Sequence, residues 1–324
     1  MYVTSLTANG SWQKQDSIMN VTVKGTICGI IAAVSYGMNP LGALFLYEQG
    51  INANSVLFYR FTIAATIIGI IMLLTKKSFG VDRKQLGTTC VLGILFGISS
   101  VSLFSSFYYM DAGVASTLLF VYPIMVAVIM AAFFHEKVSI ATIFSIGLAL
   151  AGIALLYKGE DGTSLSGIGV MLVMLSSLSY AIYIVLVNRS SLGMPALKLT
   201  FYVLIFCILT ISAFSLFSEN GRLQMLTTPS MWGFASILAL GPTVISLIMM
   251  TLSVKYIGST PTAIMGALEP LTAVMIGVTI FGETFTARLA IGITMILMAV
   301  ILIIAAKSVH TPHWHLRLKH GKAK

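Results

Sequence analysis

The chain has 324 residues, of which 57% are hydrophobic and 9% are charged, and it carries a formal net charge of +9. An average soluble domain has about 25% charged residues. This composition and a mean hydropathy of +0.97 therefore exclude a water-soluble fold and predict an integral membrane protein. The basic residues are scattered along the edges of apolar segments, which argues against a nucleic-acid partner.

Ten apolar segments are long enough to span a bilayer, whose hydrocarbon core is about 30 Å thick and requires roughly 20 helical residues. We expect them at residues 24–46, 54–75, 86–109, 113–134, 139–157, 165–187, 197–217, 231–254, 259–281 and 287–306. The first is too long for a signal peptide and no small-residue cleavage site follows it, so it counts as a span. The expected fold is an all-α integral membrane protein with ten transmembrane helices.

Positive charge is distributed unequally between the two sides of the membrane. If the N-terminus is cytoplasmic, 15 of the 19 lysine and arginine residues fall on the inner side. The four on the outer side are Arg60, Lys158, Arg222 and Arg288. Because cytoplasmic loops carry an excess of basic residues, we predict that both termini are cytoplasmic. The basic loop at residues 76–84 and the basic tail can then contact anionic lipid headgroups.

The chain repeats itself at an offset of 147 residues, where residues 98–136 align with residues 245–283 without a gap. Residues that are rare in this sequence recur at equivalent positions: Pro123 matches Pro270, and Glu136 matches Glu283. Five spans per repeat is an odd number, so the second repeat must enter the membrane from the opposite side. Inverted repeats of this kind are typical of secondary transporters.

The repeat divides the chain into four parts. We predict a cytoplasmic N-terminal segment at residues 1–22, a first five-helix repeat at 23–157, a second, inverted five-helix repeat at 158–306, and a basic cytoplasmic tail at 307–324. The tail contains four histidines and Trp314, and we expect it to lie on the membrane surface rather than to bind a metal.

Three features of the sequence form a recognisable set: the string LFYRFTIAA that opens the second span, a proline in the fourth span of each half, and the string LEPLTAVMIGVTIFGE. Together they resemble the EamA-type transporters of the drug/metabolite transporter superfamily, over residues 22–306. The resemblance implies a ten-helix protein of the inner cell membrane that moves amino acids, related metabolites or drugs, often outward. The two halves differ at one position: the residue before the proline is Tyr122 in the fourth span and Glu269 in the ninth.

Glu269 is the most informative single residue, because it lies near the middle of the apolar stretch 258–282 and directly precedes Pro270. A carboxylate near the bilayer midplane costs about 3 kcal/mol on insertion scales and marks a substrate or ion pathway in many membrane proteins. Glu269 is either a carboxylate that binds a proton or the ammonium group of a substrate, or an acid that connects the ninth span to its neighbours by a hydrogen bond.

Five polar side chains are candidates for a substrate site: Tyr36, Asn39, Tyr122, Tyr180 and Glu269. The tyrosines lie deep in their spans and can present aromatic faces and hydroxyls to a zwitterionic or cationic molecule. Asn39 can hydrogen-bond either a substrate or a neighbouring helix. The family resemblance implies that spans 1, 3, 4, 6, 8 and 9 surround the central cavity.

Four prolines lie within or beside the predicted spans: Pro40, Pro123, Pro242 and Pro270. Each removes a backbone donor and loosens its helix. They are either hinges around a cavity or tolerated kinks. The pairing of Pro123 with Pro270 in the repeat favours hinges.

Other polar residues have a structural interpretation. Arg60 falls at the outer end of the second span, where it either attracts an anionic group or, more simply, anchors the helix. Glu136 and Glu283 end helices at opposite faces, and we expect them to cap neighbouring helices or to pair with loop cations. A run of hydroxyls in the third span either allows close helix packing or contacts substrate. It comprises Ser99, Ser102, Ser105 and Ser106.

Enzyme motifs and metal-binding patterns are missing from the sequence. Its three cysteines lie inside predicted spans without metal-like spacing, so we expect no metal and no cofactor. An intramembrane enzyme needs a clustered catalytic set, and a channel needs rings of like charges or carbonyl filters. The sequence offers one deep carboxylate instead.

The predicted function is secondary active transport, most simply the export of small metabolites such as amino acids by alternating access. It is driven by an ion gradient, in which protons are the candidate ion and Glu269 the candidate coupling residue, or by the substrate gradient itself. The alternative is an exporter of lipophilic cations that is coupled to protons through the same residue. An amino acid also needs a donor for its carboxylate. For this the sequence offers no deep arginine or lysine, only hydroxyls, Asn39 and helix ends.

Overall fold

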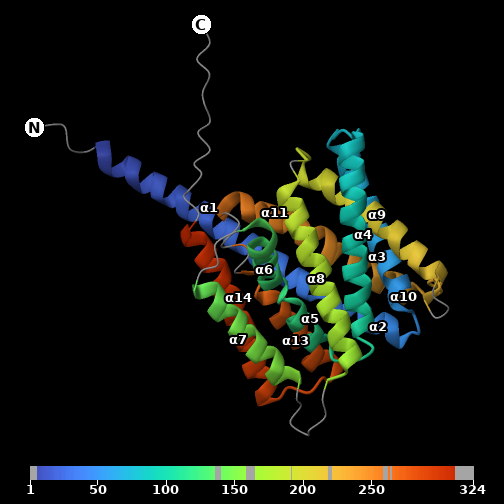
Figure 1. Ribbon diagram of the computed structural model, residues 1–324. Coiled ribbons are helices and arrows are strands. Elements are labelled where there is room, and N and C mark those ends of the chain that lie inside the picture. The colour runs from blue at the N-terminus through green and yellow to red at the C-terminus, as the bar shows by residue number, and fades with distance from the viewer. Residues whose placement is uncertain are drawn as a thin grey trace, which may run out of the picture.

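A computed structural model describes residues 6–135, 140–157, 165–190, 192–217, 221–257, 262 and 265–310. Over these ranges the chain folds into helices without any strand, and most of the helices lie side by side in one bundle (Figure 1). The basic tail beyond His310 and the predicted cap Glu136 lie outside the described residues.

The first half contains α1 (Leu6–Gly37), α2 (Asn39–Glu48), α3 (Ala53–Leu74), α4 (Arg83–Ser106), α5 (Ala112–Leu119), α6 (Tyr122–Phe134) and α7 (Ile140–Tyr157). The second half contains α8 (Gly167–Arg189), α9 (Ala196–Phe217), α10 (Pro229–Ala239), the π-helix η2 (Leu240–Ile245), α11 (Ser246–Ile257), α13 (Leu268–Phe281) and α14 (Ala287–His310). In the described residues, seven helical segments are long and apolar enough to cross a membrane, and three shorter apolar helices accompany them. The number of spans and the orientation of the termini stay predictions.

Helix α1 is longer than the first predicted span. It begins at Leu6, while the part of it that is long and apolar enough to cross a membrane begins at Val21, close to the predicted residue 24. The prediction follows the apolar run, but residues 6–23 contain no proline, so nothing in the backbone stops the helix from extending beyond the apolar part.

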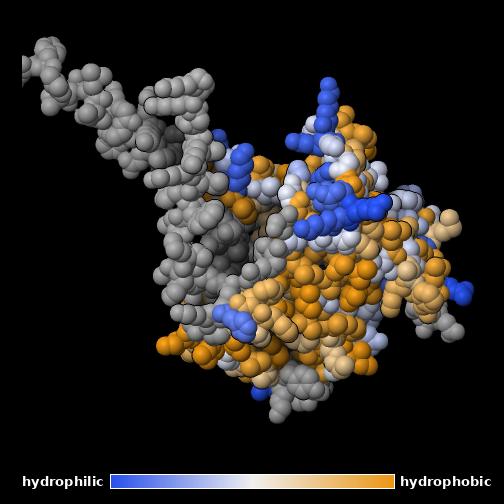
Figure 2. Space-filling view, turned by 45° about the horizontal axis from the view of Figure 1, so that its top comes forward, coloured by the Kyte–Doolittle hydropathy of each residue, from blue (hydrophilic) through white to orange (hydrophobic). Residues whose placement is uncertain are grey.

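The surface of the bundle is apolar over much of its area, as a lipid-facing surface must be. Figure 2 shows hydrophobic residues covering most of one face, with hydrophilic residues gathered toward its upper edge. Leu74, Leu216 and Phe217 are 79%, 79% and 90% exposed, which water would strongly disfavour. The seven long helices and this surface identify a multi-pass membrane protein.

Four helix breaks coincide with the four prolines. Pro40 is the second residue of α2, after the break at Met38, and Pro123 is the second residue of α6, after the break at Phe120. Pro242 lies within the π-helix η2, and Pro270 is the third residue of α13. Each proline lacks the N–H that would bond to the carbonyl four residues earlier, so the helix opens at that point.

Two of the carbonyls released by these prolines find side-chain donors. The hydroxyl of Thr243 donates to the carbonyl of Leu238, four residues before Pro242, at 3.2 Å. The hydroxyl of Ser177 in α8 donates to the carbonyl of Leu119, four residues before Pro123, at 3.0 Å. These bonds remove the cost of leaving a buried acceptor unpaired, so the breaks are stable parts of the fold.

Helix contacts across the bundle occur in matched pairs. Helix α4 packs against α8 as α1 packs against α11, α4 packs against α9 as α3 packs against α10, and α6 packs against α8 as α1 packs against α13. Three further contacts, α7 with α14, α3 with α9 and α5 with α13, join equivalent spans of the two halves. Each of these contacts is therefore either its own counterpart or has a counterpart in the exchanged halves, whereas the contact of α6 with α14 has no equally extensive counterpart between α13 and α7.

Glu283 caps the start of α5 from the loop after α13. Its Oε1 accepts from the backbone N–H of Ala112 at 2.7 Å, and its Oε2 accepts from that of Gly113 at 3.2 Å. Burial and the nearby carboxylate of Asp111 raise the pKa of Glu283, and the two backbone donors lower it. The carboxylate therefore satisfies two donors that the first turn of α5 leaves free and joins the two broken spans.

We expect Glu283→Ala to lower the free energy of unfolding by roughly 1–2 kcal/mol, because both backbone donors lose their partner. Thermal unfolding of the detergent-solubilised protein measures the change. Asp111→Asn is the matched control, since Asp111 precedes the same helix and makes no side-chain capping hydrogen bond. Equal melting temperatures for Glu283→Ala and Asp111→Asn would contradict the capping role.

Candidate functional site

A cavity of about 70 Å³ lies where the broken helices meet. One water molecule needs roughly 10–15 Å³ on this measure, so the space holds a few waters. Its lining comes from α1, α2, α4, α5, α6, α8, α11, α13 and the break between α5 and α6. The residues are Tyr36, Gly37, Asn39, Leu103, Ser116, Leu119, Phe120, Tyr122, Tyr180, Ser246, Met250, Glu269, Pro270 and Ala273.

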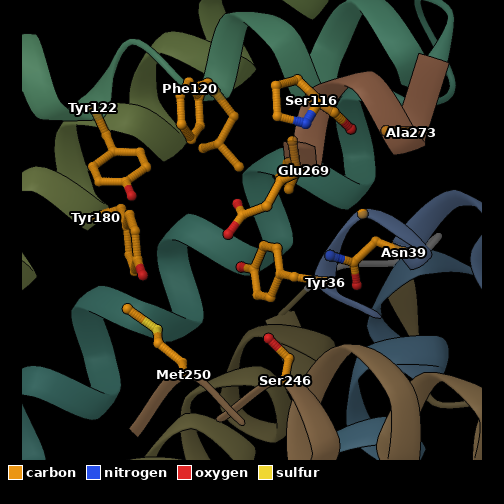
Figure 3. A pocket seen from close by; sticks show the side chains of 14 residues that line it. Tyr36, Asn39, Ser116, Phe120, Tyr122, Tyr180, Ser246, Met250, Glu269 and Ala273 are labelled. Carbon is orange, nitrogen blue, oxygen red and sulfur yellow. The ribbon is translucent and has the colours of Figure 1, made fainter. Parts of the chain in front are cut away.

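The structure brings all five predicted substrate-binding residues into this one cavity. Figure 3 shows the carboxylate of Glu269 and the side chains of Tyr36, Tyr122 and Tyr180 directed toward a common space, with Asn39 at its edge. Three of the breaks explain the convergence, since Tyr36 and Asn39 flank the first, Tyr122 follows the second, and Glu269 follows the turn before α13. That these residues bind substrate stays a prediction.

The carboxylate of Glu269 has no partner of its own. Among the described residues, no side chain donates a hydrogen bond to it and no cation pairs with it. Within the described residues, Glu269 therefore does not connect α13 to a neighbouring helix by a side-chain hydrogen bond. Instead, Glu269 faces a small cavity lined by both polar and apolar side chains, and a cavity is one of the places where an acid is accommodated inside a membrane protein.

Tyrosines form the wall opposite Glu269. The rings of Tyr122 and Tyr180 meet edge to face, with centroids 4.7 Å apart and an interplanar angle of 78°. Tyr180 also stacks on Tyr183, one turn further along α8, with centroids 5.7 Å apart. Tyr122 and Tyr180 thus offer aromatic faces and hydroxyls to the cavity beside the carboxylate, and Tyr183 supports the ring of Tyr180 from outside the cavity lining.

A second chamber of about 20 Å³ adjoins the first and contains Arg60. The two chambers share Tyr36, Asn39, Leu103, Leu119 and Tyr180. The sequence predicts that Arg60 anchors the outer end of its span, but the structure shows that this residue is buried. It is the eighth residue of α3, its side chain is only 3% exposed, and it points into the bundle.

A signal for Arg60 is present in the sequence. A single arginine inside an apolar segment is costly, and such residues line functional pathways. The apolar segment itself begins at residue 54, which places Arg60 near the membrane edge, and the sequence does not reveal its burial by other helices. Of the serine run in the third span, Ser99 joins two helices, because its hydroxyl lies 3.0 Å from that of Ser176 in α8. The hydroxyl of Ser106 donates to the carbonyl of Leu103 within α4.

Comparison with known proteins identifies the family. Residues 23–158 and 167–305 each match the model of the EamA-like transporter family. The chain belongs to this family. The EamA resemblance expected from the sequence is thereby confirmed, and the protein is a membrane transporter rather than an enzyme.

Several relatives of this EamA-like transporter cover most of its length. The uncharacterized transporter YcbK of Bacillus subtilis is 24% identical over 281 residues, which is 83% of this chain and 89% of that protein. An uncharacterized transporter of Archaeoglobus fulgidus is 26% identical over 222 residues, 68% of this chain and 76% of its own. One crystal structure superposes with a TM-score of 0.63 over 89% of this chain and 99% of its own, at 17% identity, and so shares the fold.

Proposed function

We propose that this EamA-like transporter is a secondary active carrier that moves small metabolites such as amino acids across the cytoplasmic membrane. One observation carries the proposal: the carboxylate of Glu269, which no described residue pairs with, faces a cavity enclosed by broken helices. Such a carboxylate can bind a proton in one step and a substrate ammonium group in another, which links the two fluxes.

In alternating access the carrier changes between an inward-open and an outward-open state, and inverted repeats allow each half to adopt in one state the arrangement that the other half has in the other state. We propose ten spans in two inverted repeats, with both termini in the cytoplasm and Pro40, Pro123, Pro242 and Pro270 as hinges. The matched helix contacts support the repeat, and the placement of 15 of 19 basic residues supports the orientation. Breaks at all four prolines give the cavity walls segments that can tilt separately.

Export of lipophilic cations is the second candidate, and the aromatic wall favours it. Tyr122 and Tyr180 line the same cavity as the acid Glu269, which is an arrangement that attracts organic cations. Arg60 in the adjoining chamber opposes this candidate, because a second positive charge would be repelled there. We therefore place metabolite transport first.

Reconstitution into liposomes tests the proposal. Uptake of labelled amino acids, nucleosides and tetraphenylphosphonium is measured with a proton gradient imposed in each direction. We expect a proton gradient in one of the two directions to raise the uptake of one substrate class to at least ten times that of protein-free liposomes. For an exporter that exchanges substrate for protons, the stimulating gradient is the one with the acidic side inside the liposome. Uptake at the same rate with and without either gradient would show that the protein is a facilitator without proton coupling. The absence of uptake for every compound would contradict the proposal.

A further inference from the structure

Arg60 is held in a defined position inside the bundle. Its Nε donates to the hydroxyl of Thr243 at 2.9 Å, and that hydroxyl in turn donates to the carbonyl of Leu238, which the neighbouring Pro242 leaves free. The guanidinium also lies 5.1 Å from the ring centroid of Phe61 and 5.5 Å from that of Phe104. The break in the eighth span and two aromatic rings therefore fix where this charge sits.

The positive charge of Arg60 has no counter-ion. No carboxylate of the described residues pairs with the guanidinium, and Thr243 occupies only its Nε. A buried charge without a partner is strongly unfavourable, so proteins pair such groups or reserve them for a ligand. The fork of a guanidinium matches the two oxygens of a carboxylate, which makes a carboxylate the natural partner.

A second unsatisfied group lies in the wall shared by the two chambers. Asn39 is 5% exposed, lines both chambers, and its Oδ1 accepts no hydrogen bond. This oxygen is not accessible from the chambers, and the amide directs its nitrogen toward the cavity instead (Figure 3). Tyr36 also lines both chambers, the first together with Glu269 and the second together with Arg60.

We propose that Arg60 forms a binding subsite for an acidic group, so that the site selects substrates carrying a carboxylate as well as an ammonium group. The carboxylate binds the guanidinium of Arg60 in the second chamber. The ammonium group binds Glu269 in the first chamber. The inference rests on the proposed function and adds to it a residue that determines charge specificity.

Charge balance explains the selection. A zwitterion brings a partner for each of the two unpaired charges. A lipophilic cation satisfies Glu269 and leaves Arg60 unpaired and repelled, while an anion satisfies Arg60 and is repelled by Glu269. The chambers hold about 70 and 20 Å³, so a compact zwitterion is favoured over an extended one.

Ligand analogues test the subsite in the wild-type protein. The twenty protein amino acids are screened individually for thermal stabilisation of the purified transporter, and the strongest ligand is compared with its amide and with the acid that lacks its amino group. We expect each analogue to bind about ten- to hundredfold more weakly, because each loses one charged hydrogen-bonding partner. An amide that binds as well as the amino acid would overturn the subsite.

Substitution of Arg60 tests the assignment to this residue. In Arg60→Gln we expect the amino acid and its amide to bind with equal, weak affinity, and Arg60→Lys should recover part of the discrimination. A merely structural role for Arg60 would lower stability while the ratio of the two affinities stayed at the wild-type value, which would overturn the assignment. Arg222→Gln, which changes an exposed arginine outside the cavity, is the matched control and should keep the wild-type ratio.

The two proposals fail in different ways. Proton-driven uptake of an organic cation, with no stabilisation by any amino acid, would overturn the subsite and leave the carrier function standing. No uptake of any compound and no stabilisation by any amino acid would overturn both.

Discussion

In Glu269→Gln we expect gradient-driven uptake to be lost and the remaining substrate exchange to fall roughly ten- to hundredfold. Glutamine keeps the size of the side chain but cannot take up or release a proton, so the coupled step disappears. It also replaces a charge-assisted interaction with the substrate ammonium group, which is worth about 1.5–3 kcal/mol. Because the carboxylate accepts no hydrogen bond from the described residues, its loss should leave the fold intact.

The measurement is uptake by proteoliposomes with and without the proton gradient, together with exchange at equal pH on both sides. Glu48→Gln is the matched control, because Glu48 ends α2 with an exposed carboxylate outside the cavity. Exchange that survives while the gradient response disappears would assign Glu269 to the proton alone. Wild-type values for both rates would make Glu269 a structural residue.

Gly37→Ala should lower the free energy of unfolding by roughly 1–3 kcal/mol, the range typical of overpacking a close contact. Gly37 ends α1 and lies in the cavity wall, where a Cβ would meet the backbone oxygen of Glu269 at 2.5 Å and Cβ of Thr272 at 2.6 Å. Both atoms belong to α13 and neither is the flexible end of a side chain. Alanine therefore forces α1 and α13 apart and moves Glu269.

Thermal unfolding and uptake are measured together for this substitution. Gly87→Ala is the matched control, since Gly87 lies in α4 and an alanine Cβ there would have no neighbouring atom within 4 Å. At this position the better helix propensity of alanine should stabilise the protein by up to about 1 kcal/mol. A Gly37→Ala protein with wild-type stability and uptake would show that α1 and α13 are not in fixed contact.

The depth of Glu269 and the prolines beside the cavity could be predicted from the sequence because they depend on local properties. A long apolar run gives the length of a span, and a carboxylate near its middle faces a cavity or a polar partner in most membrane proteins. A proline removes its own N–H wherever it stands, so the positions of the helix breaks follow closely from Pro40, Pro123, Pro242 and Pro270. The strings LFYRFTIAA and LEPLTAVMIGVTIFGE and the proline in the fourth span of each half carry the resemblance to the EamA family, which the comparison confirms.

The sequence by itself thus determined the class of protein, the places where its helices bend and the acid in its cavity. Only the tertiary structure decided which faces of the helices meet. Arg60 and Thr243 are 183 residues apart, and the donors that Glu283 caps lie 171 and 170 residues away, so no local pattern reveals these bonds. The burial of Arg60 depends on Phe104 of α4 and on Thr243 of η2, which no pattern around residue 60 reveals, and this burial makes the cavity a site with two charges.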